Sequence, residues 1–203
     1  MTRCPWCGTD PQYVAYHDRE WGVPATADTI HFEFLVLESA QAGLSWLTIL
    51  RKRENYRKAY AGFDPRIVAN FTDSDIRRLL ADSGIVRNRR KVAASLQNAR
   101  AFLAVQREWG SFSRYIWSFV NFNPVVNQWS QVSELPARSD LSDRVSRDMK
   151  QRGFSHLGSV TVYAHLQAAG LINDHLTSCF RYSQIKANVS KTAVRRSLGL
   201  DPD

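Results

Sequence analysis

The chain has 203 residues, of which 44% are hydrophobic and 23% charged, as is ordinary for a globular protein. No apolar run reaches transmembrane length and the N-terminus has no apolar signal-peptide core, so we expect a cytoplasmic protein that does not associate with membranes. The net charge of +8 suggests a polyanionic partner, with nucleic acid the first choice.

The N-terminal segment, residues 4–22, combines prolines and glycines with a high density of aromatic rings. This composition favours loops, with one short helix over residues 11–17. The rings belong to Trp6, Tyr13, Tyr16 and Trp21. They form either an arm packed on the core or an aromatic wall beside a binding pocket.

The most apolar stretch is FLVLESAQAGLSWLTIL, residues 34–50, and its single charge is Glu38. Its apolar residues recur at helical spacing, so we predict a core helix that begins with Asp28 as N-cap, is interrupted near Gly43 and ends near Arg51. A carboxylate in such surroundings loses hydration and must be paired, protonated or functional. Glu38 is therefore either a buried glutamate satisfied by hydrogen bonds or the floor of a ligand pocket.

Several shorter helices are predicted next. A basic helix ends at Gly62, Asp64 and Pro65 open a short one, and Thr72 caps another. The following long helix starts at Arg89 and stops by Gly110.

A short basic turn over residues 84–89 joins the last two of these helices in a helix–hairpin–helix pattern. The amides of such a turn and of the second helix N-terminus bind a DNA phosphate. The charges beside it come from Arg87, Arg89, Arg90 and Lys91. A solvated basic face on an ordinary helical corner explains the same pattern.

The C-terminal part continues with helices and no strand pattern. Ser139 caps a helix that ends at Gly153, and a helix rich in small residues ends at Gly170. Past Arg181 the sequence is polar and basic without an apolar face, which predicts a flexible basic tail over 181–203. We therefore predict an all-α protein with one compact domain, residues 1–180.

Candidate metal ligands occur at both ends of the chain. His175 and Cys179 are four residues apart, and Cys4 and His17 lie near the N-terminus. Two cysteines and two histidines form a closed tetrahedral zinc site, which would be structural and would join the two ends. The odd count of three cysteines argues against a disulfide framework. Cys7 forms a C-x-x-C pair with Cys4, so a set containing Cys7 stays open on spacing alone.

The chain resembles the DNA-3-methyladenine glycosylase I family from Thr2 to about Cys179. The resemblance lies in the stretches RCPW, YVAYHDREWGVP, LESAQAGLSWLTILRKRENYR, DSGIVRNRRK, WSFVNFNP and KQRGFSHLGSVTVYAHLQAAGLINDH. It implies a compact helix–hairpin–helix glycosylase with one structural zinc per chain. The ligands that it implies are Cys4, His17, His175 and Cys179, and Cys7 has no such role.

The resemblance also implies a base pocket and a wedge. The pocket maps onto Glu38, Tyr16 and Trp46, with Trp6, Tyr13 and Trp21 nearby. Gly43 and Leu44 fall where a loop wedges into the duplex. The family lacks the catalytic aspartate of other helix–hairpin–helix glycosylases, and this sequence offers no strong candidate.

The implied chemistry suits these residues. Methylation at N3 makes adenine cationic and weakens its glycosidic bond, so strong acid catalysis is unnecessary. A Glu38 carboxylate would favour the cationic base and stabilise an oxocarbenium sugar, while the aromatic rings hold the extruded base. Lys91 is interpreted as a phosphate contact, so no lyase step is expected. The expected partner is double-stranded alkylated DNA, bound by a monomer.

Three rival hypotheses remain at this stage. A non-catalytic zinc-stabilised DNA-binding module explains the charge, the hairpin and the Cys/His set, but it does not explain Glu38. A zinc hydrolase or deaminase requires three protein ligands and an open position at the metal. A glycosylase of the same fold with a different alkylated purine as substrate is the third.

Overall fold

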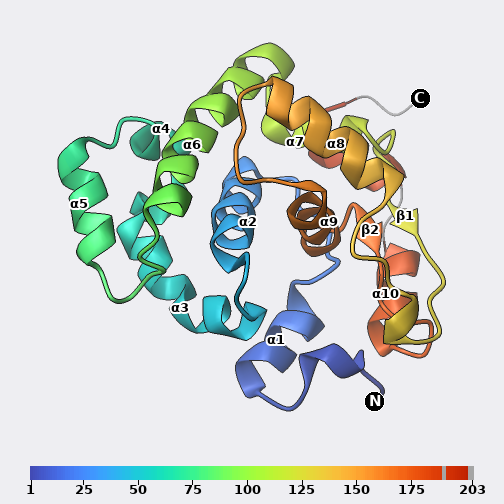
Figure 1. The fold of residues 1–203 in the computed structure, drawn as a ribbon. Helices are drawn as coiled ribbons and strands as arrows, with labels where there is room; N and C mark the ends of the chain where they lie inside the picture. The colour runs from blue at the N-terminus through green and yellow to red at the C-terminus, as the bar shows by residue number, and fades with distance from the viewer. Residues whose placement is uncertain (189–190, 201–203) are drawn as a thin grey trace.

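We analysed a computed structural model, which describes residues 1–188 and 191–200 of the chain. The described residues are mostly helical, which confirms the predicted all-α class. Helix α2 (Asp28–Gln41) runs through the middle, with α9 (Ser159–Ala168) beside it and the other helices around them (Figure 1). Among these residues no helix combines the length and the apolar composition that a membrane span requires.

The remaining elements follow in chain order. The first half contains η1 (Pro5–Cys7), α1 (Pro11–Arg19), α3 (Trp46–Ala59), η2 (Ala61–Phe63), α4 (Pro65–Val68), α5 (Asp73–Ala81) and α6 (Arg89–Trp109). The second half contains α7 (Phe112–Ser118), β1 (Val125–Val126), η3 (Val132–Glu134), α8 (Asp140–Gln151), β2 (Ile172–Asn173), α10 (Phe180–Asn188) and α11 (Lys191–Ser197). The two strands pair in parallel, with Val125 opposite Ile172. Two residues are too few to give the alternating pattern by which a sequence reveals a strand.

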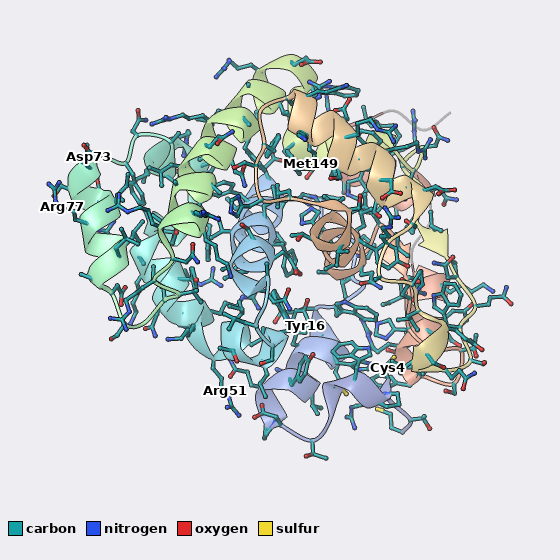
Figure 2. The ribbon with its side chains drawn as sticks, in the orientation of Figure 1. Cys4, Tyr16, Arg51, Asp73, Arg77 and Met149 are labelled. Carbon is teal, nitrogen blue, oxygen red and sulfur yellow. The ribbon has the colours of Figure 1, made fainter. Side chains whose placement is uncertain are left out.

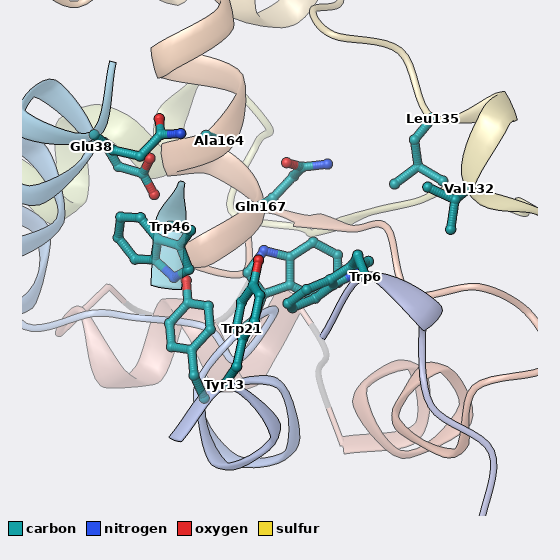
Figure 3. Close-up of a pocket in the computed structure, with 11 residues that line it drawn as sticks. Trp6, Tyr13, Trp21, Glu38, Trp46, Val132, Leu135, Ala164 and Gln167 are labelled. Carbon is teal, nitrogen blue, oxygen red and sulfur yellow. The ribbon is translucent and has the colours of Figure 1, made fainter. Parts of the chain in front are cut away.

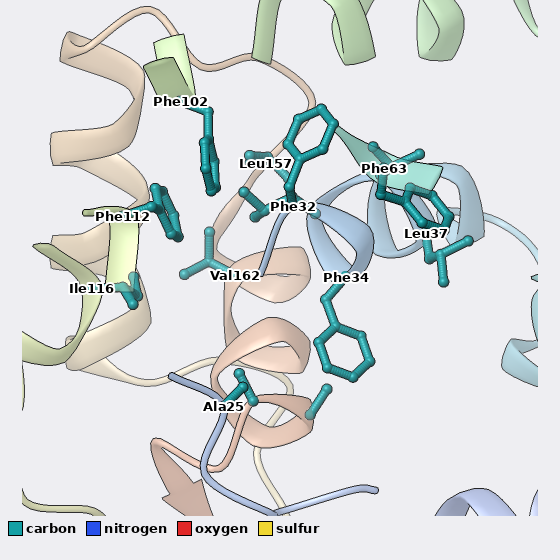
Figure 4. Packing of buried hydrophobic residues seen from close by; sticks show 14 of the residues in the cluster. Ala25, Phe32, Phe34, Leu37, Phe63, Phe102, Phe112, Ile116, Leu157 and Val162 are labelled. Atoms are coloured by element: carbon teal, nitrogen blue, oxygen red, sulfur yellow. The ribbon is translucent and has the colours of Figure 1, made fainter. Parts of the chain in front are cut away.

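Helix α2 is the core of the molecule. It packs against α3, α6, α7 and α9, and its side chains from His31 to Ala40 are all buried. Phe32 and Phe34 point to different sides of the helix in Figure 4 and both meet other buried side chains. A helix that is apolar on all faces must lie inside a protein, and each such side chain contributes about 1.5–3 kcal/mol by burial. The two acidic residues inside this span are therefore drawn into the core.

The predicted break in the long core helix is confirmed, whereas its predicted N-cap is wrong. Gly43, with φ of 81°, lies between α2 and α3, and Ser45 caps α3. The N-cap of α2 is Ala27, which makes no side-chain capping bond. The Asp28 carboxylate instead accepts hydrogen bonds from the amides of Phe112 (2.9 Å) and Ser113 (2.8 Å) at the start of α7.

The predicted helical hairpin is confirmed. Thr72 and Asp75 form a capping box on α5, and α6 begins at Arg89. The side chain of Asn88 caps α6 by accepting hydrogen bonds from two backbone amides. Gly110 ends α6 in the left-handed conformation, as expected of a glycine after a helix.

The structure differs from the expected flexible tail over 181–203. Helices α10 and α11 occupy most of its described part, and Val194 and Leu198 are buried in the main hydrophobic cluster. Arg114 of α7 donates hydrogen bonds to the carbonyl oxygens of Leu198 (3.0 Å) and Gly199 (3.4 Å). Residues 189–190 and 201–203 lie outside the described residues. The division into one domain and a tail remains a prediction.

Candidate active site

A cavity of about 300 Å³ opens between the N-terminal segment, the α2–α3 corner and α9. All six residues that the resemblance assigned to the base pocket line it, and Figure 3 labels each of them except Tyr16. They are Trp6, Tyr13, Tyr16, Trp21, Glu38 and Trp46. In Figure 2, which shows the whole molecule, Tyr16 and Cys4 lie toward one end, well separated from Asp73 and Arg77 of α5. Residues distant in the sequence thus meet in one cavity, although the roles of the six remain predictions.

The aromatic rings support one another. The Trp6 ring centroid lies 4.8 Å from that of Trp21 and 5.3 Å from that of Tyr13. Tyr16 and Trp46 approach to 5.5 Å. Tilted and edge-to-face pairs at such distances are favourable and fix the orientation of the rings. The N-terminal segment is therefore both an arm packed on the core and a wall of the cavity.

Glu38 lies in the cavity with only 4% of its surface exposed. No described residue donates a hydrogen bond to its carboxylate or forms an ion pair with it. Burial raises the pKa of Glu38 to about 8. The raised pKa means that the protein disfavours the negative charge until a cation or a donor enters. Of the two interpretations from the sequence, the structure favours a pocket acid over a glutamate satisfied by hydrogen bonds.

Glu33, on the same helix, shows the contrasting arrangement. Its carboxylate is 5% exposed and accepts from Arg53 (2.8 Å) and Arg57 (2.9 Å). A paired, hydrogen-bonded acid of this kind is structural. The sequence analysis did not single out Glu33, although Arg53 and Arg57 share one face of the following helix and could have signalled a buried partner.

Two aromatic residues of the wall, Tyr16 and Trp46, carry uncharged hydrogen-bond donors. Burial and the neighbouring Glu38 carboxylate raise the pKa of Tyr16, so its phenol stays neutral and can donate a hydrogen bond. The Trp46 Nε1 atom is buried without a partner among the described residues. Both are available to a ligand in the cavity.

The sequence analysis missed other residues that line the cavity. These are Gln41, Val132, Leu135, Ala164 and Gln167. Ala164 and Gln167 are three residues apart in the predicted small-residue helix, a spacing that places them on one face. Nothing in the sequence near Val132 and Leu135 indicates that their loop reaches the cavity.

The α2–α3 corner projects a hydrophobic side chain next to the cavity. Leu44 is 39% exposed, and its amide and carbonyl are both bonded to Gln41 at 2.7 Å. A Cβ placed on Gly43 would meet nothing within 4 Å, so the corner is open to solvent. Both positions suit the wedge implied by the resemblance, which remains a prediction.

The hairpin presents three of its four basic side chains to solvent. Arg87, Arg89 and Arg90 are exposed, and none has an ion-pair partner among the described residues. Lys91 differs from its interpretation as a phosphate contact, because Nζ donates to the carbonyl oxygens of Ala40 (2.8 Å) and Ala42 (2.6 Å). Its ammonium group thus binds the free carbonyls at the C-terminal end of α2.

A buried cluster at the joined ends of the chain could hold a metal ion. The ligand atoms of Cys4, His17, His175 and Cys179 all lie within 4.8 Å of one another. Cys179 Sγ is 3.5 Å from His17 Nε2 and 3.6 Å from His175 Nδ1. Metal bonds of about 2.3 Å to sulfur and about 2.0 Å to nitrogen in a tetrahedron give ligand separations of about 3.5 Å. The cluster therefore has the dimensions of a tetrahedral site.

The histidine tautomers also suit a metal. His17 Nδ1 is 2.8 Å from Asp18 Oδ1 and His175 Nε2 is 3.1 Å from the Trp21 carbonyl oxygen. Each contact requires a proton on that nitrogen, which leaves the other nitrogen with a lone pair for the metal. Cys7 is not in this cluster, and its thiol instead donates to the Cys4 carbonyl oxygen at 3.1 Å.

The helical fold, the hairpin and the aromatic cavity with its buried acid are the features expected of a helix–hairpin–helix DNA glycosylase. The sequence pattern of the methyladenine glycosylase family matches residues 6–182. The chain therefore belongs to the methyladenine glycosylase family.

Individual relatives agree with this assignment. DNA-3-methyladenine glycosylase 1 of Escherichia coli K12 is 47% identical over 182 residues, which cover 90% of this chain and 97% of the relative. DNA-3-methyladenine glycosylase of Haemophilus influenzae is 44% identical over 178 residues, or 88% and 96% of the two chains. A solved structure of 3-methyladenine DNA glycosylase I from Staphylococcus aureus is 42% identical, with a TM-score of 0.85 over 89% of this chain and 96% of its own.

Proposed function

We propose that the protein is a monofunctional DNA glycosylase that releases 3-methyladenine from double-stranded alkylated DNA and acts as a monomer. The observation that carries this proposal is an unpaired, buried acid in an aromatic cavity. A non-catalytic DNA-binding module has no use for such an acid. The relatives carry this activity in their names, and the S. aureus structure concerns the recognition of 3-methyladenine.

Recognition begins with extrusion of the damaged base. Leu44 enters the duplex from the exposed α2–α3 corner, while Arg87, Arg89 and Arg90 bind phosphates. Extrusion costs a few kcal/mol, less for a damaged base. Stacking and cation–π contact with Tyr16 and Trp46 offset this cost by roughly 1–2 kcal/mol per ring.

Glu38 then supplies selectivity and rate. When the cationic base enters, its positive charge lowers the Glu38 pKa that burial had raised, and Glu38 releases its proton to solvent. The resulting carboxylate favours the methylated cation over neutral adenine and stabilises positive charge on the sugar as the glycosidic bond breaks. The bonding electrons leave with the base and neutralise it. Water adds to the sugar carbon and loses a proton to solvent.

No covalent step is assigned to Lys91. Its ammonium group is bonded to two carbonyl oxygens at the C-terminal end of α2, and Lys91 is not among the residues that line the cavity. A lyase reaction requires a free amine at the sugar, so hydrolysis is the only chemistry that we propose.

The metal that we propose for the Cys/His cluster is zinc, one per chain, bound by Cys4, His17, His175 and Cys179. Two thiolates and two imidazoles suit its borderline-soft character. Four protein ligands leave no position for water, so the ion would hold the N-terminal aromatic segment to the C-terminal part and take no part in hydrolysis.

Base release from methylated DNA tests the proposed function. Chromatography should detect free 3-methyladenine with the wild-type protein. Glu38→Gln should lower the single-turnover rate by about 100-fold or more, in the range of losing a preorganised electrostatic group, while DNA binding is retained. DNA binding without release by the wild-type protein would instead identify a binding module.

A further inference from the structure

Asp174, just after β2, is a buried hub of hydrogen bonds. Asp174 is 1% exposed, and its carboxylate accepts from four donors, two on α9 and two in the segment that follows β1. The donors are the Tyr163 hydroxyl (2.5 Å), Gln167 Nε2 (2.7 Å), Asn127 Nδ2 (2.7 Å) and Trp129 Nε1 (2.7 Å). Four donors satisfy a carboxylate completely, so the orientation of each partner is fixed.

The hub determines which end of the Gln167 amide faces the cavity. A carboxylate accepts hydrogen bonds only, so the amide nitrogen must lie against Asp174 and the amide oxygen must point away from it. Gln167 lines the cavity, and Figure 3 shows its amide oxygen on the side of Glu38 and its nitrogen on the opposite side. No described residue donates a hydrogen bond to that oxygen.

The cavity thus offers two acceptors that face it from neighbouring helices, Glu38 on α2 and Gln167 on α9. Among the described residues, no lysine or arginine lines it. An adenine methylated at N3 carries hydrogen-bond acceptors at N1 and N7, and its only N–H donors are the two on the 6-amino group. That group is the part of the base that matches two acceptors.

We propose that Gln167, oriented by Asp174, accepts a hydrogen bond from the 6-amino group of the extruded base and makes the site selective against 6-oxo purines such as 3-methylguanine. The inference rests on the proposed function and names a residue that sets specificity. A 6-oxo base would place an oxygen, which is an acceptor, at the position of the 6-amino donor and would leave the Gln167 oxygen unpaired. Polar mismatches of this kind give strong discrimination.

Gln167→Met tests the proposal, because methionine keeps the length of the side chain and removes the acceptor. Single-turnover release of 3-methyladenine and of 3-methylguanine is measured from the same methylated DNA, and binding of each free base is followed by tryptophan fluorescence. Release and binding of 3-methyladenine should fall about 10- to 100-fold, the effect of losing one hydrogen bond to a charged group. The values for 3-methylguanine should stay the same or rise.

Gln97→Met is the matched control. The Gln97 amide also donates to a partner, the Gly153 carbonyl oxygen at 2.7 Å, but it lies on α6 and does not line the cavity. Both bases should be released and bound as by the wild-type protein.

Asp174→Asn is the second test. An asparagine side chain can donate a hydrogen bond to Gln167, which allows the Gln167 amide to turn its NH₂ group toward the cavity. The preference for 3-methyladenine over 3-methylguanine should then fall. The melting temperature and metal content of this variant are measured as controls for its folding.

The outcomes distinguish the role of Gln167 from the proposed function. An equal loss for both bases in Gln167→Met, or no loss for 3-methyladenine, overturns the role of Gln167 while the proposed function stands. Absence of 3-methyladenine release by the wild-type protein overturns the proposed function itself.

Discussion

Glu33 and Glu38 occupy one helix, are buried to the same extent and differ only in their neighbours. Glu33 accepts hydrogen bonds from two arginines, whereas Glu38 faces a cavity of aromatic rings. Burial alone therefore does not define the candidate catalytic residue. The absence of a partner among the described residues does, because an unpaired buried carboxylate costs free energy that only a ligand can return.

The raised pKa of Glu38 makes stability depend on pH. The carboxyl group has a pKa of about 8 in the folded protein and of 4.5 when it is unperturbed. Between these values the unfolded chain loses the proton and the folded protein keeps it, so the free energy of unfolding falls as pH rises, and the loss is complete above about pH 8. Glu38→Gln should therefore stabilise the free protein by an amount that grows from pH 5 to pH 8, to on the order of a few kcal/mol.

Urea unfolding at a series of pH values measures this difference. Glu33→Gln is the matched control and should destabilise the protein instead, because Arg53 and Arg57 each lose the buried one of their two carboxylate partners. A stability difference between Glu38→Gln and wild type that does not change with pH would contradict the raised pKa.

At the scale of elements, the α2–α3 corner depends on the hairpin. Lys91, two residues into α6, binds carbonyl oxygens at the end of α2, and Gln41 ties the corner to Leu44. The hairpin that we propose as the phosphate contact is thus bonded directly to the corner that bears Leu44. On that proposal, one helix determines the positions of both the phosphate contact and the wedge.

Lys91→Met should lower the free energy of unfolding by about 1–3 kcal/mol and slow base release, because two charge-assisted hydrogen bonds are lost. It should leave the dependence of DNA binding on salt unchanged. Arg90→Met provides the comparison: it should reduce the salt slope by about one phosphate contact and change stability by about 0.5 kcal/mol or less. A reduced salt slope in Lys91→Met would restore its interpretation as a phosphate contact.

Elements that depend on local sequence could be predicted, and those that depend on distant partners could not. The Thr72 cap and the break at Gly43 depend on neighbouring residues in the sequence, and both predictions are confirmed. Asp28 has the chemistry of an N-cap, but its carboxylate binds the first two amides of α7, whose position relative to α2 only the folded chain defines. Val194 and Leu198 are both buried and lie four residues apart, which is a helical spacing. Two apolar residues among many basic ones were too few to predict a packed helix in this segment.

On the scale of the whole molecule, the Cys/His cluster, which could hold a metal ion, brings the N-terminal segment and the C-terminal part together beside the cavity wall. The family resemblance implied the same four residues as ligands, whereas residue type and spacing alone left Cys7 as a candidate. The aromatic rings of the cavity could be found by their density in one segment. Gln167, Val132 and Leu135 could not, because their presence there is a property of the assembled fold.

Cys179→Ser should reduce the metal content below one ion per chain and lower the melting temperature by on the order of 10 °C, because a structural site with three ligands binds weakly. Elemental analysis and calorimetry measure the two effects. Cys7→Ser, which alters a buried thiol outside the cluster, should keep the metal. Full metal content in Cys179→Ser would show that the ligand set is wrong.

The Cys/His cluster sets an order of events during synthesis of the chain. The N-terminal segment carries four of the five aromatic residues that line the cavity, but its cluster partners His175 and Cys179 are synthesised much later. The aromatic wall therefore cannot be fixed by the cluster before Cys179 has been added to the chain. A truncated translation product that ends before Cys179 would retain the exposed basic hairpin without a finished cavity, and would bind DNA without repairing it.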